Sequence, residues 1–326
     1  MAYLECQLMK IILPAQVVSH AEARIRAKYP DAQIVTTNDT GIPDGDVSDA
    51  TILVRWWYTL EDFMRILHMA PNIKWVYTPS AGIEYMDLAY MQARNIVLTN
   101  AAGVHAIPIA EFIMMFVLHH AKRAPQLRDF PREQWEAVER TKLDELYGKT
   151  MAIIGLGGIG QETAKRAKAF GMRVIGSRRR PQVTSFVDHV VSDLEWRTLL
   201  PDADVVVLAT PLTERTRGMI DAGAFALMKS TAYLVNVARG NVINTDDLID
   251  ALTHGKIAGA GLDVQPEEPL PVTHPLWDAP NVWITPHISA SSPKTRMRMM
   301  DLFLENLDRF VQRQPMHQVV DYSEGY

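Results

Sequence analysis

The stretch Met151-Ala-Ile-Ile-Gly155-Leu156-Gly157-Gly158-Ile159-Gly160 decides the fold. An apolar run of strand type enters a G-x-G-x-x-G turn, and Gln161–Phe170 then shows the apolar spacing of an amphipathic helix. In such a unit the first glycine permits the tight turn, the second lets the backbone approach a pyrophosphate, and the third lets helix and strand pack closely. The N–H groups at the start of the helix bind the phosphates. The sequence therefore predicts a dinucleotide site at Leu156–Gly160.

Short β-type runs alternate with helical patterns on both sides of this unit, which indicates an α/β fold with parallel sheets. Before the unit, strands are predicted at Lys10–Pro14, Gln33–Thr36, Thr51–Val54, Lys74–Tyr77 and Ile96–Leu98. After it, strands are predicted at Arg173–Gly176, Asp204–Ala209, Tyr233–Val237, Ala258–Leu262 and Val282–Thr285. The predicted helices include Ser19–Lys28, Leu60–Met69, Ile107–Ala124, Asp246–His254 and Pro293–Gln314.

The length and composition of the chain restrict the classes of function that it can have. A chain of 326 residues exceeds the usual size of a single core, so two domains are expected. The net charge of −5 disfavours binding to nucleic acid or to an anionic membrane. Cys6 is the only cysteine, and neither HExxH nor CxxC occurs, so we expect no disulfide, no metal site and a cytoplasmic setting. The start of the chain lacks a secretory signal pattern, and the longest apolar run, Phe112–Leu118, is too short to span a bilayer.

The segment after Gly176 bears on the choice of cofactor. It reads Ser177-Arg178-Arg179-Arg180, and no acidic residue occurs between Glu162 and Asp188. An NAD site normally places Asp or Glu here to bind the ribose hydroxyls, whereas guanidinium groups bind a 2′-phosphate. A solvated basic surface run is the alternative. The sequence favours NADP(H), with NAD(H) as the second choice.

Three chemically different residues, Arg239, Glu268 and His287, each follow a predicted strand. Parallel strands place their carboxyl ends at one edge of a sheet, where ligands bind. Reduction of a 2-oxo acid needs a cation to hold the carboxylate and polarise the carbonyl, and an imidazole to donate a proton. A carboxylate beside the imidazole orients the ring and stabilises its protonated form. Taken singly, these residues could be a surface ion pair, a solvated acid and a loop histidine; their joint placement favours catalysis.

Several long motifs occur in one order along the chain: GLGGIG at Gly155–Gly160, TPLTERTRGMI at Thr210–Ile220, NVARGNVINTDDLIDAL at Asn236–Leu252, GLDVQPEEPLP at Gly261–Pro271 and HPLWDAPNVWITPHIS at His274–Ser289. Over nearly its whole length the chain resembles the D-isomer specific 2-hydroxyacid dehydrogenase family, which includes glyoxylate/hydroxypyruvate reductases. The resemblance implies two doubly wound parallel-sheet domains. A Rossmann dinucleotide-binding domain (residues 102–292) is expected to be inserted into a flavodoxin-like substrate domain (residues 1–101 and 293–326).

The resemblance also implies roles for individual residues. The catalytic residues would be Arg239, Glu268 and His287, and the Glu at 268 counts against formate as substrate, because formate dehydrogenases of this superfamily carry Gln there. The backbone of Ser80, Ala81, Gly82 and Ile83 would bind the substrate together with Arg239 and His287. A homodimer through the helix Ile107–Ala124 is expected. The cofactor contacts would be Leu156, Gly157, Gly158, Ile159, Gly160, Ser177, Arg178, Arg179, Thr210, Pro211, Thr213, Val237, Ala238, Asp263, Ser289 and Ala290.

The function predicted is that of an NADP(H)-preferring oxidoreductase that interconverts a 2-oxo acid and an (R)-2-hydroxy acid. Two alternatives stay open: a dinucleotide-sensing corepressor or scaffold of the same fold, and a dehydrogenase for another substrate such as phosphite. Arg55 and Trp56 are substrate-binding candidates, since they end a strand of the substrate domain, and Trp56 and Trp57 could shape a pocket for a bulky oxo acid or pack the core. The sequence does not decide whether Trp135 reaches the active site of a partner subunit. It also does not decide which oxo acid is the substrate or in which direction the reaction runs.

Overall fold

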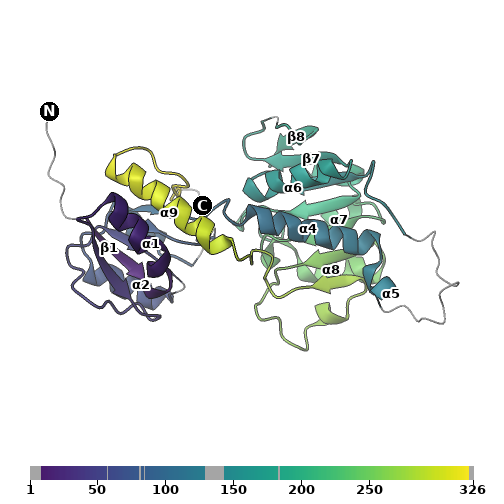
Figure 1. Ribbon diagram of the computed structural model, residues 1–326. Coiled ribbons are helices and arrows are strands. Elements are labelled where there is room, and N and C mark those ends of the chain that lie inside the picture. Colours follow the sequence, from purple (N-terminus) through teal and green to yellow (C-terminus); the bar gives the residue numbers. More distant parts are fainter. Residues whose placement is uncertain are drawn as a thin grey trace. The chain divides into compact units, whose positions relative to one another are not determined.

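The computed structural model describes residues 9–56, 58–80, 82–83, 85–128, 143–182 and 184–322. Two compact units make up this part of the chain (Figure 1). Unit 1 comprises the described residues of Met1–Val104 and Ser292–Tyr326, and unit 2 those of His105–Ser291. Trp57, Ala81 and Trp135, which the sequence analysis names, lie outside the described residues, as does Cys6.

Unit 1 is built on a five-stranded parallel sheet with the order β2-β1-β3-β4-β5. The order is that of doubly wound flavodoxin-like sheets. The last helix of the chain, α9 (Thr295–Val311), packs on this sheet, since Phe303 stacks on Trp75 with ring centroids 5.4 Å apart. The other elements are β1 (Lys10–Pro14), α1 (Ala15–Lys28), β2 (Gln33–Thr37), β3 (Ile52–Val54), α2 (Leu60–Met69), β4 (Trp75–Tyr77), α3 (Leu88–Ala93) and β5 (Val97–Thr99).

Unit 2 is built on a seven-stranded parallel sheet with the order β12-β11-β10-β9-β6-β7-β8. The chain starts in the middle at β6, proceeds to β7 and β8, and then crosses back to β9, so the order reverses between β6 and β9. That reversal is the point at which Rossmann folds bind dinucleotides. The strands are β6 (Thr150–Ile154), β7 (Arg173–Arg178), β8 (His189–Ser192), β9 (Val205–Leu208), β10 (Tyr233–Asn236), β11 (Gly259–Leu262) and β12 (Val282–Ile284).

Helices cover both faces of the seven-stranded sheet (Figure 1). One face packs α4 (Ala106–Ala121) and α6 (Gly158–Ala169) in a core that includes Phe116, Ala164 and Val207. The opposite face packs α7 (Ala222–Leu227) and α8 (Thr245–Thr253) with Phe225, Leu248 and Leu208. The remaining elements are α5 (Ala124–Arg128), η3 (Trp196–Asp202), η4 (Gly240–Val242) and η5 (Pro275–Asp278).

The predicted α/β architecture with two doubly wound parallel sheets is confirmed, and the errors are local. Three short elements, β8, α3 and α7, were not predicted from the sequence. Each has few residues, and β8 (HVVS) is only partly buried, so little apolar pattern marks them. The strand β7 extends two residues past its predicted end at Gly176, since Ser177 and Arg178 pair with Val191 and Ser192 of β8. The helix predicted to Ala124 ends instead at Ala121.

Within the described residues, no helix is both long and apolar enough to cross a membrane.

Candidate active site

The strand ends of unit 2 lie level with one another. Their registered positions are Ser177 of β7, Ile154 of β6, Leu208 of β9, Asn236 of β10, Leu262 of β11 and Ile284 of β12. The glycine turn follows β6, Arg239 follows β10, Glu268 follows β11 and His287 follows β12. The fold thus brings these segments, spread over more than a hundred residues of sequence, to one edge of one sheet.

The glycine turn after β6 has the geometry that a pyrophosphate needs. A Cβ on Gly155, whose φ is +106°, would lie 2.6 Å from the carbonyl oxygen of Ala209, so the turn presses against the segment after β9. A Cβ on Gly160 would lie 2.3 Å from the oxygen of Gly155, which is the close helix–strand approach. A Cβ on Gly157, just before α6, would meet nothing within 4 Å. Open space over Gly157 at a helix start therefore fits a phosphate group.

The end of β7 presents cations. Ser177 is buried and its carbonyl accepts hydrogen bonds from the N–H groups of Gly155 (3.2 Å) and Leu156 (2.9 Å), whereas Arg178 is half-buried and Arg179 is exposed. Asp188, the next acidic residue along the chain, is bound to the backbone N–H of Val174 at 2.8 Å, which is at the opposite end of the strand. The residues that follow Gly176 thus offer guanidinium groups to a ligand at this edge.

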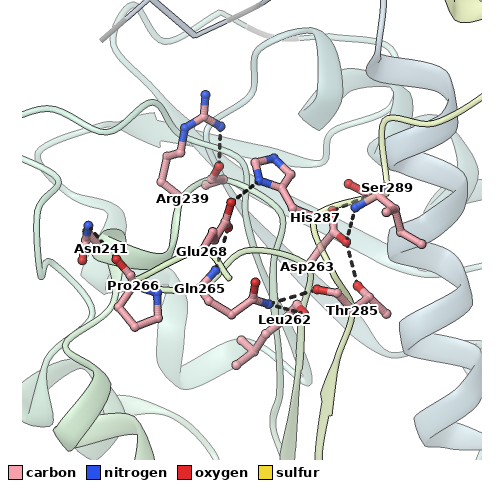
Figure 2. A network of polar contacts seen from close by, with 12 residues as sticks. Arg239, Asn241, Leu262, Asp263, Gln265, Pro266, Glu268, Thr285, His287 and Ser289 are labelled. Atoms are coloured by element: carbon pink, nitrogen blue, oxygen red, sulfur yellow. Dashed lines mark hydrogen bonds and ion pairs between the residues drawn. The ribbon is translucent and has the colours of Figure 1, made fainter. Parts of the chain in front are cut away.

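Glu268 and His287 form a directly bonded pair. Oε2 of Glu268 lies 2.7 Å from Nδ1 of His287, and Oε1 accepts a hydrogen bond of 3.0 Å from the backbone N–H of Gln265 (Figure 2). The two side chains are 37% and 43% exposed, so the pair is accessible from solvent. Because the carboxylate engages Nδ1, the nitrogen left for another ligand is Nε2.

The backbone that carries His287 is held in an uncommon conformation. Its φ is +52°, in the left-handed region, and the turn around it is held by the buried carboxylate of Asp263. Oδ1 of Asp263 accepts hydrogen bonds from the Thr285 hydroxyl (2.7 Å) and the Ile288 N–H (2.9 Å), and Oδ2 accepts one from the Ser289 N–H (2.9 Å). Three hydrogen bonds offset the cost of burying this charge. Asp263, expected to contact the cofactor, thus braces the His287 turn.

Arg239 leaves the sheet on a loop that is fastened by a buried amide. The side chain of Asn236, which is fully buried, donates to the carbonyl of Arg239 (3.0 Å) and accepts from the N–H of Ala238 (3.0 Å). The guanidinium of Arg239 donates to the carbonyl of Ala238 at 2.8 Å. In the view of Figure 2, Arg239 and His287 stand on either side of the Glu268 carboxylate.

Three residues that hold these loops in place were not predicted from the sequence: Gly240, Gln265 and the Asn236 just described. A Cβ on Gly240 would lie only 1.9 Å from the carbonyl carbon of Gln265, so the loop of Arg239 packs backbone to backbone on the loop of Glu268. Gln265 is 7% exposed and its side-chain amide bonds to backbone carbonyls. Gly240 could have been found as a glycine next to the candidate Arg239, and Asn236 as a polar residue at the end of an apolar strand. No local signal in the sequence marks Gln265.

The remaining predicted cofactor contacts follow the same strand ends. Thr210, Pro211 and Thr213 come after β9, where the N–H of Thr213 donates to the hydroxyl of Thr216 at 2.7 Å. Val237 and Ala238, both buried, come after β10, and Ser289 and Ala290 come after His287. Leu156 is buried, and Gly158 and Ile159 open α6.

The predicted substrate residues of unit 1 lie at the end of its own sheet. Arg55 and Trp56 follow β3 and are 4% and 5% exposed, so both pack inside the unit. The guanidinium of Arg55 donates to the carbonyl of Tyr58 (2.8 Å) and lies 4.5 Å from the ring centroid of Tyr85. Burial lowers the pKa of Arg55. The carbonyl of Ser80 accepts from the N–H of Ala101 at 3.1 Å, and the substrate-binding role of Ser80, Gly82, Arg55 and Trp56 stays a prediction.

Comparison with known proteins gives a consistent result. Residues 114–289 match the family described as D-isomer specific 2-hydroxyacid dehydrogenase, NAD binding domain. A glyoxylate reductase of Thermofilum pendens is 37% identical over 249 residues, which cover 74% of this chain and 73% of that protein. The human glyoxylate reductase/hydroxypyruvate reductase is 36% identical over 258 residues, covering 77% of this chain and 78% of that one.

A comparison with solved structures shows that the fold is shared as well. The D-isomer specific 2-hydroxyacid dehydrogenase of Xanthobacter autotrophicus Py2, in complex with NADPH and MES, superimposes with a TM-score of 0.81 at 27% identity, covering 98% of this chain and 99% of the other. Three features of unit 2 are consistent with membership of that family: the glycine turn, the strand ends that lie level with one another, and the pair of Glu268 and His287. The chain belongs to the D-isomer specific 2-hydroxyacid dehydrogenase family of oxidoreductases, with an NAD(P)-binding domain and a likeness to glyoxylate reductases.

Proposed function

We propose that this protein is an NADP(H)-preferring reductase of a small 2-oxo acid, which converts hydroxypyruvate to (R)-glycerate or glyoxylate to glycolate, a product without a stereocentre. The observation that carries the proposal is the 2.7 Å pair of Glu268 and His287 at the same sheet edge as the glycine turn and Arg239. A bulkier 2-oxo acid is the alternative within the same chemistry.

The chain's own residues would handle the substrate's charge and its proton. NADPH, when bound at Leu156–Gly160, would supply the hydride. Arg239 would bind the substrate carboxylate and polarise the carbonyl, because guanidinium is always charged and has several donors. His287 would donate the proton on Nε2 to the carbonyl oxygen as negative charge develops there, and would accept it in the reverse reaction. Glu268, bonded to Nδ1, would hold the ring in place and balance the positive charge of the protonated ring.

The test of this function is a spectrophotometric assay that follows the absorbance of reduced nicotinamide. NADPH and NADH are compared with glyoxylate, hydroxypyruvate, pyruvate and phenylpyruvate as oxidants. Oxidation of NADPH by a member of this panel is the expected result. With hydroxypyruvate, pyruvate or phenylpyruvate, whose products are chiral, a chiral column should identify the (R)-2-hydroxy acid. Bound NADPH with no turnover on any of the four would contradict the proposed activity and favour a dinucleotide sensor or another substrate.

The cofactor preference is proposed from Arg178 at the end of β7, from Arg179 after it, and from the relative of Xanthobacter autotrophicus that was solved with NADPH. Arg178→Asp removes one guanidinium and introduces the carboxylate that would bind ribose hydroxyls. Hydrogen bonds to charged groups contribute about 1.5–3 kcal/mol, so the ratio of kcat/KM for NADPH to that for NADH should fall by about 10- to 100-fold. The buried Ser177 is a poorer position for this test, because a carboxylate there would be desolvated.

Arg180→Asp is the matched control for that substitution. It makes the same change in charge two residues further on, at an exposed position beyond the strand end. We expect its NADPH to NADH ratio to stay within about twofold of the parent, because Arg180 is exposed and is not among the proposed cofactor contacts, and interactions of exposed charges contribute little. Equal shifts in the two variants would mean that the arginines act only through net charge, and an unchanged ratio in Arg178→Asp would remove the basis for the preference.

We also propose that the protein is a homodimer through α4. This helix packs Phe116 and Val117 on the sheet, yet it also exposes Met115 (37%) beside Phe170 of the α6 end (43%), and these residues line a groove with Leu118. Apolar side chains gathered at a groove are typical of an interface between subunits. Analytical ultracentrifugation should give the mass of two chains, and Met115→Glu should shift it toward one; a single-chain mass for the parent would refute the dimer.

A further inference from the structure

The candidate active site contains a residue whose contacts reach both members of the Glu268–His287 pair. Gln265 lies between β11 and Glu268 and is 7% exposed. Its side-chain amide nitrogen donates to the carbonyl of Leu262 at 3.3 Å and to the carbonyl of Thr285 at 3.1 Å (Figure 2). Since Leu262 ends β11 and Thr285 follows β12, this single amide ties the ends of two neighbouring strands.

One contact of Gln265 fixes the histidine side of the pair. The carbonyl of Thr285 accepts from the Gln265 amide and also from the backbone N–H of His287, at 3.0 Å. The carbonyl therefore has two donors that set its direction, and the left-handed turn of His287 starts from it. A shift of this carbonyl would rotate the backbone from which the imidazole projects.

The other contact fixes the carboxylate side. The backbone N–H of Gln265 donates to Oε1 of Glu268 at 3.0 Å, while Oε2 of Glu268 is bonded to His287. The bonds thus close a ring that runs from the Gln265 amide through Thr285 and His287 to Glu268 and back to the Gln265 N–H. Both members of the pair are thus linked to one buried residue: His287 through the side chain of Gln265 and the carbonyl of Thr285, and Glu268 through the backbone N–H of Gln265.

The chemistry of the position calls for glutamine in particular. Two backbone carbonyls need two donors, and a primary amide has two N–H groups on one nitrogen. Methionine has the same length but no donor, and an ionised glutamate would face the carbonyls with acceptors only. We infer that Gln265 is a positioning residue that holds Glu268 and His287 in their productive geometry, an inference that rests on the catalytic roles proposed above for those two residues.

The first test is Gln265→Met in the full-length protein, with NADPH and the best 2-oxo acid of the panel. Misplacement of a catalytic group by about 1 Å can cost about 10²-fold, so kcat should fall by about 10- to 100-fold. The Kd of NADPH, measured by fluorescence, should stay within about twofold. Asn241→Ala is the matched control, because its exposed amide bonds only weakly to the neighbouring carbonyl of Pro266 (3.5 Å) and lies outside the ring of bonds; its kcat should be unchanged.

The second test is a double-mutant cycle with Glu268→Gln. If Gln265 acts through the pair, Gln265→Met should change kcat by less than about threefold in the Glu268→Gln background, because coupled residues are not additive. A loss of equal size in both backgrounds, or parental kcat in Gln265→Met, would overturn the inference. A His287→Ala variant with full activity would instead overturn the proposed catalytic roles, so the two failures are distinguishable.

Should Gln265→Met fail to fold, Gln265→Glu keeps the shape of the side chain and supplies the test. A carboxyl group has at most one O–H donor where the amide has two N–H donors, so at least one of the two carbonyls loses its hydrogen bond in either protonation state, and kcat should fall with NADPH still bound. Parental kcat in Gln265→Glu would overturn the positioning role.

Discussion

Replacing His287 by alanine should lower kcat for reduction of the 2-oxo acid by about 10²- to 10⁴-fold, the usual contribution of a positioned general acid. The affinity for NADPH should stay within about twofold, because His287 itself is not a proposed cofactor contact and the proposed phosphate-binding turn follows β6, which three strands separate from β12. Stopped-flow turnover and a fluorescence titration of NADPH measure the two quantities.

His317 supplies a matched control for His287→Ala. It also pairs with a carboxylate, since its Nε2 lies 2.7 Å from Oε1 of Glu305, but the pair belongs to unit 1, with Glu305 on α9 and His317 after it. His317→Ala should leave kcat unchanged. Arg239→Ala should lose activity to a similar degree as His287→Ala, and Arg239→Lys should recover little, because lysine does not reproduce the fork of donors. Retained turnover in both His287→Ala and Arg239→Ala would refute the proposed mechanism.

Gly240→Ala is expected to be the most damaging small substitution in unit 2. The added Cβ would lie 1.9 Å from the carbonyl carbon of Gln265 and 2.3 Å from the nitrogen of Pro266, and backbone atoms cannot rotate away as a side chain would. Overpacking costs about 1–3 kcal/mol or more, against a gain of about 0.4–1 kcal/mol from the stiffer unfolded chain. A fall in Tm of roughly 3–10 °C by calorimetry should result.

The same substitution should also reduce catalysis. The clash separates the loop of Arg239 from the loop of Glu268, and a displacement of about 1 Å is worth about 10²-fold in rate. Gly157→Ala is the contrasting glycine variant, because its Cβ would meet nothing within 4 Å. Its Tm should stay near that of the parent while NADPH binding weakens, since the methyl group takes the space proposed for phosphate. Parental Tm in Gly240→Ala would show that the two loops are not in the tight contact described here.

The residues of this site differ in how readily the sequence reveals them. The turn Gly155–Gly160 could be identified at once, because its glycines, the strand before it and the helix after it are all encoded within some twenty consecutive residues. Arg239, Glu268 and His287 could also be named, since each follows a strand with a clear apolar pattern and parallel strands end at one edge. Local pattern and strand polarity predicted that these residues share one edge, while their catalytic roles rest on the chemistry and on the family resemblance and stay a proposal.

The sequence by itself thus determined the α/β class, the two doubly wound sheets, the phosphate-binding turn and the chemical types that meet at the strand ends. Only the tertiary structure decided how those types are held. The buried carboxylate of Asp263 braces the turn of His287, Gly240 lets two loop backbones touch, and Gln265 links the ends of β11 and β12. The physical reason is that a hydrogen bond or a close approach between residues twenty or more positions apart depends on strand register and burial, which no local periodicity encodes.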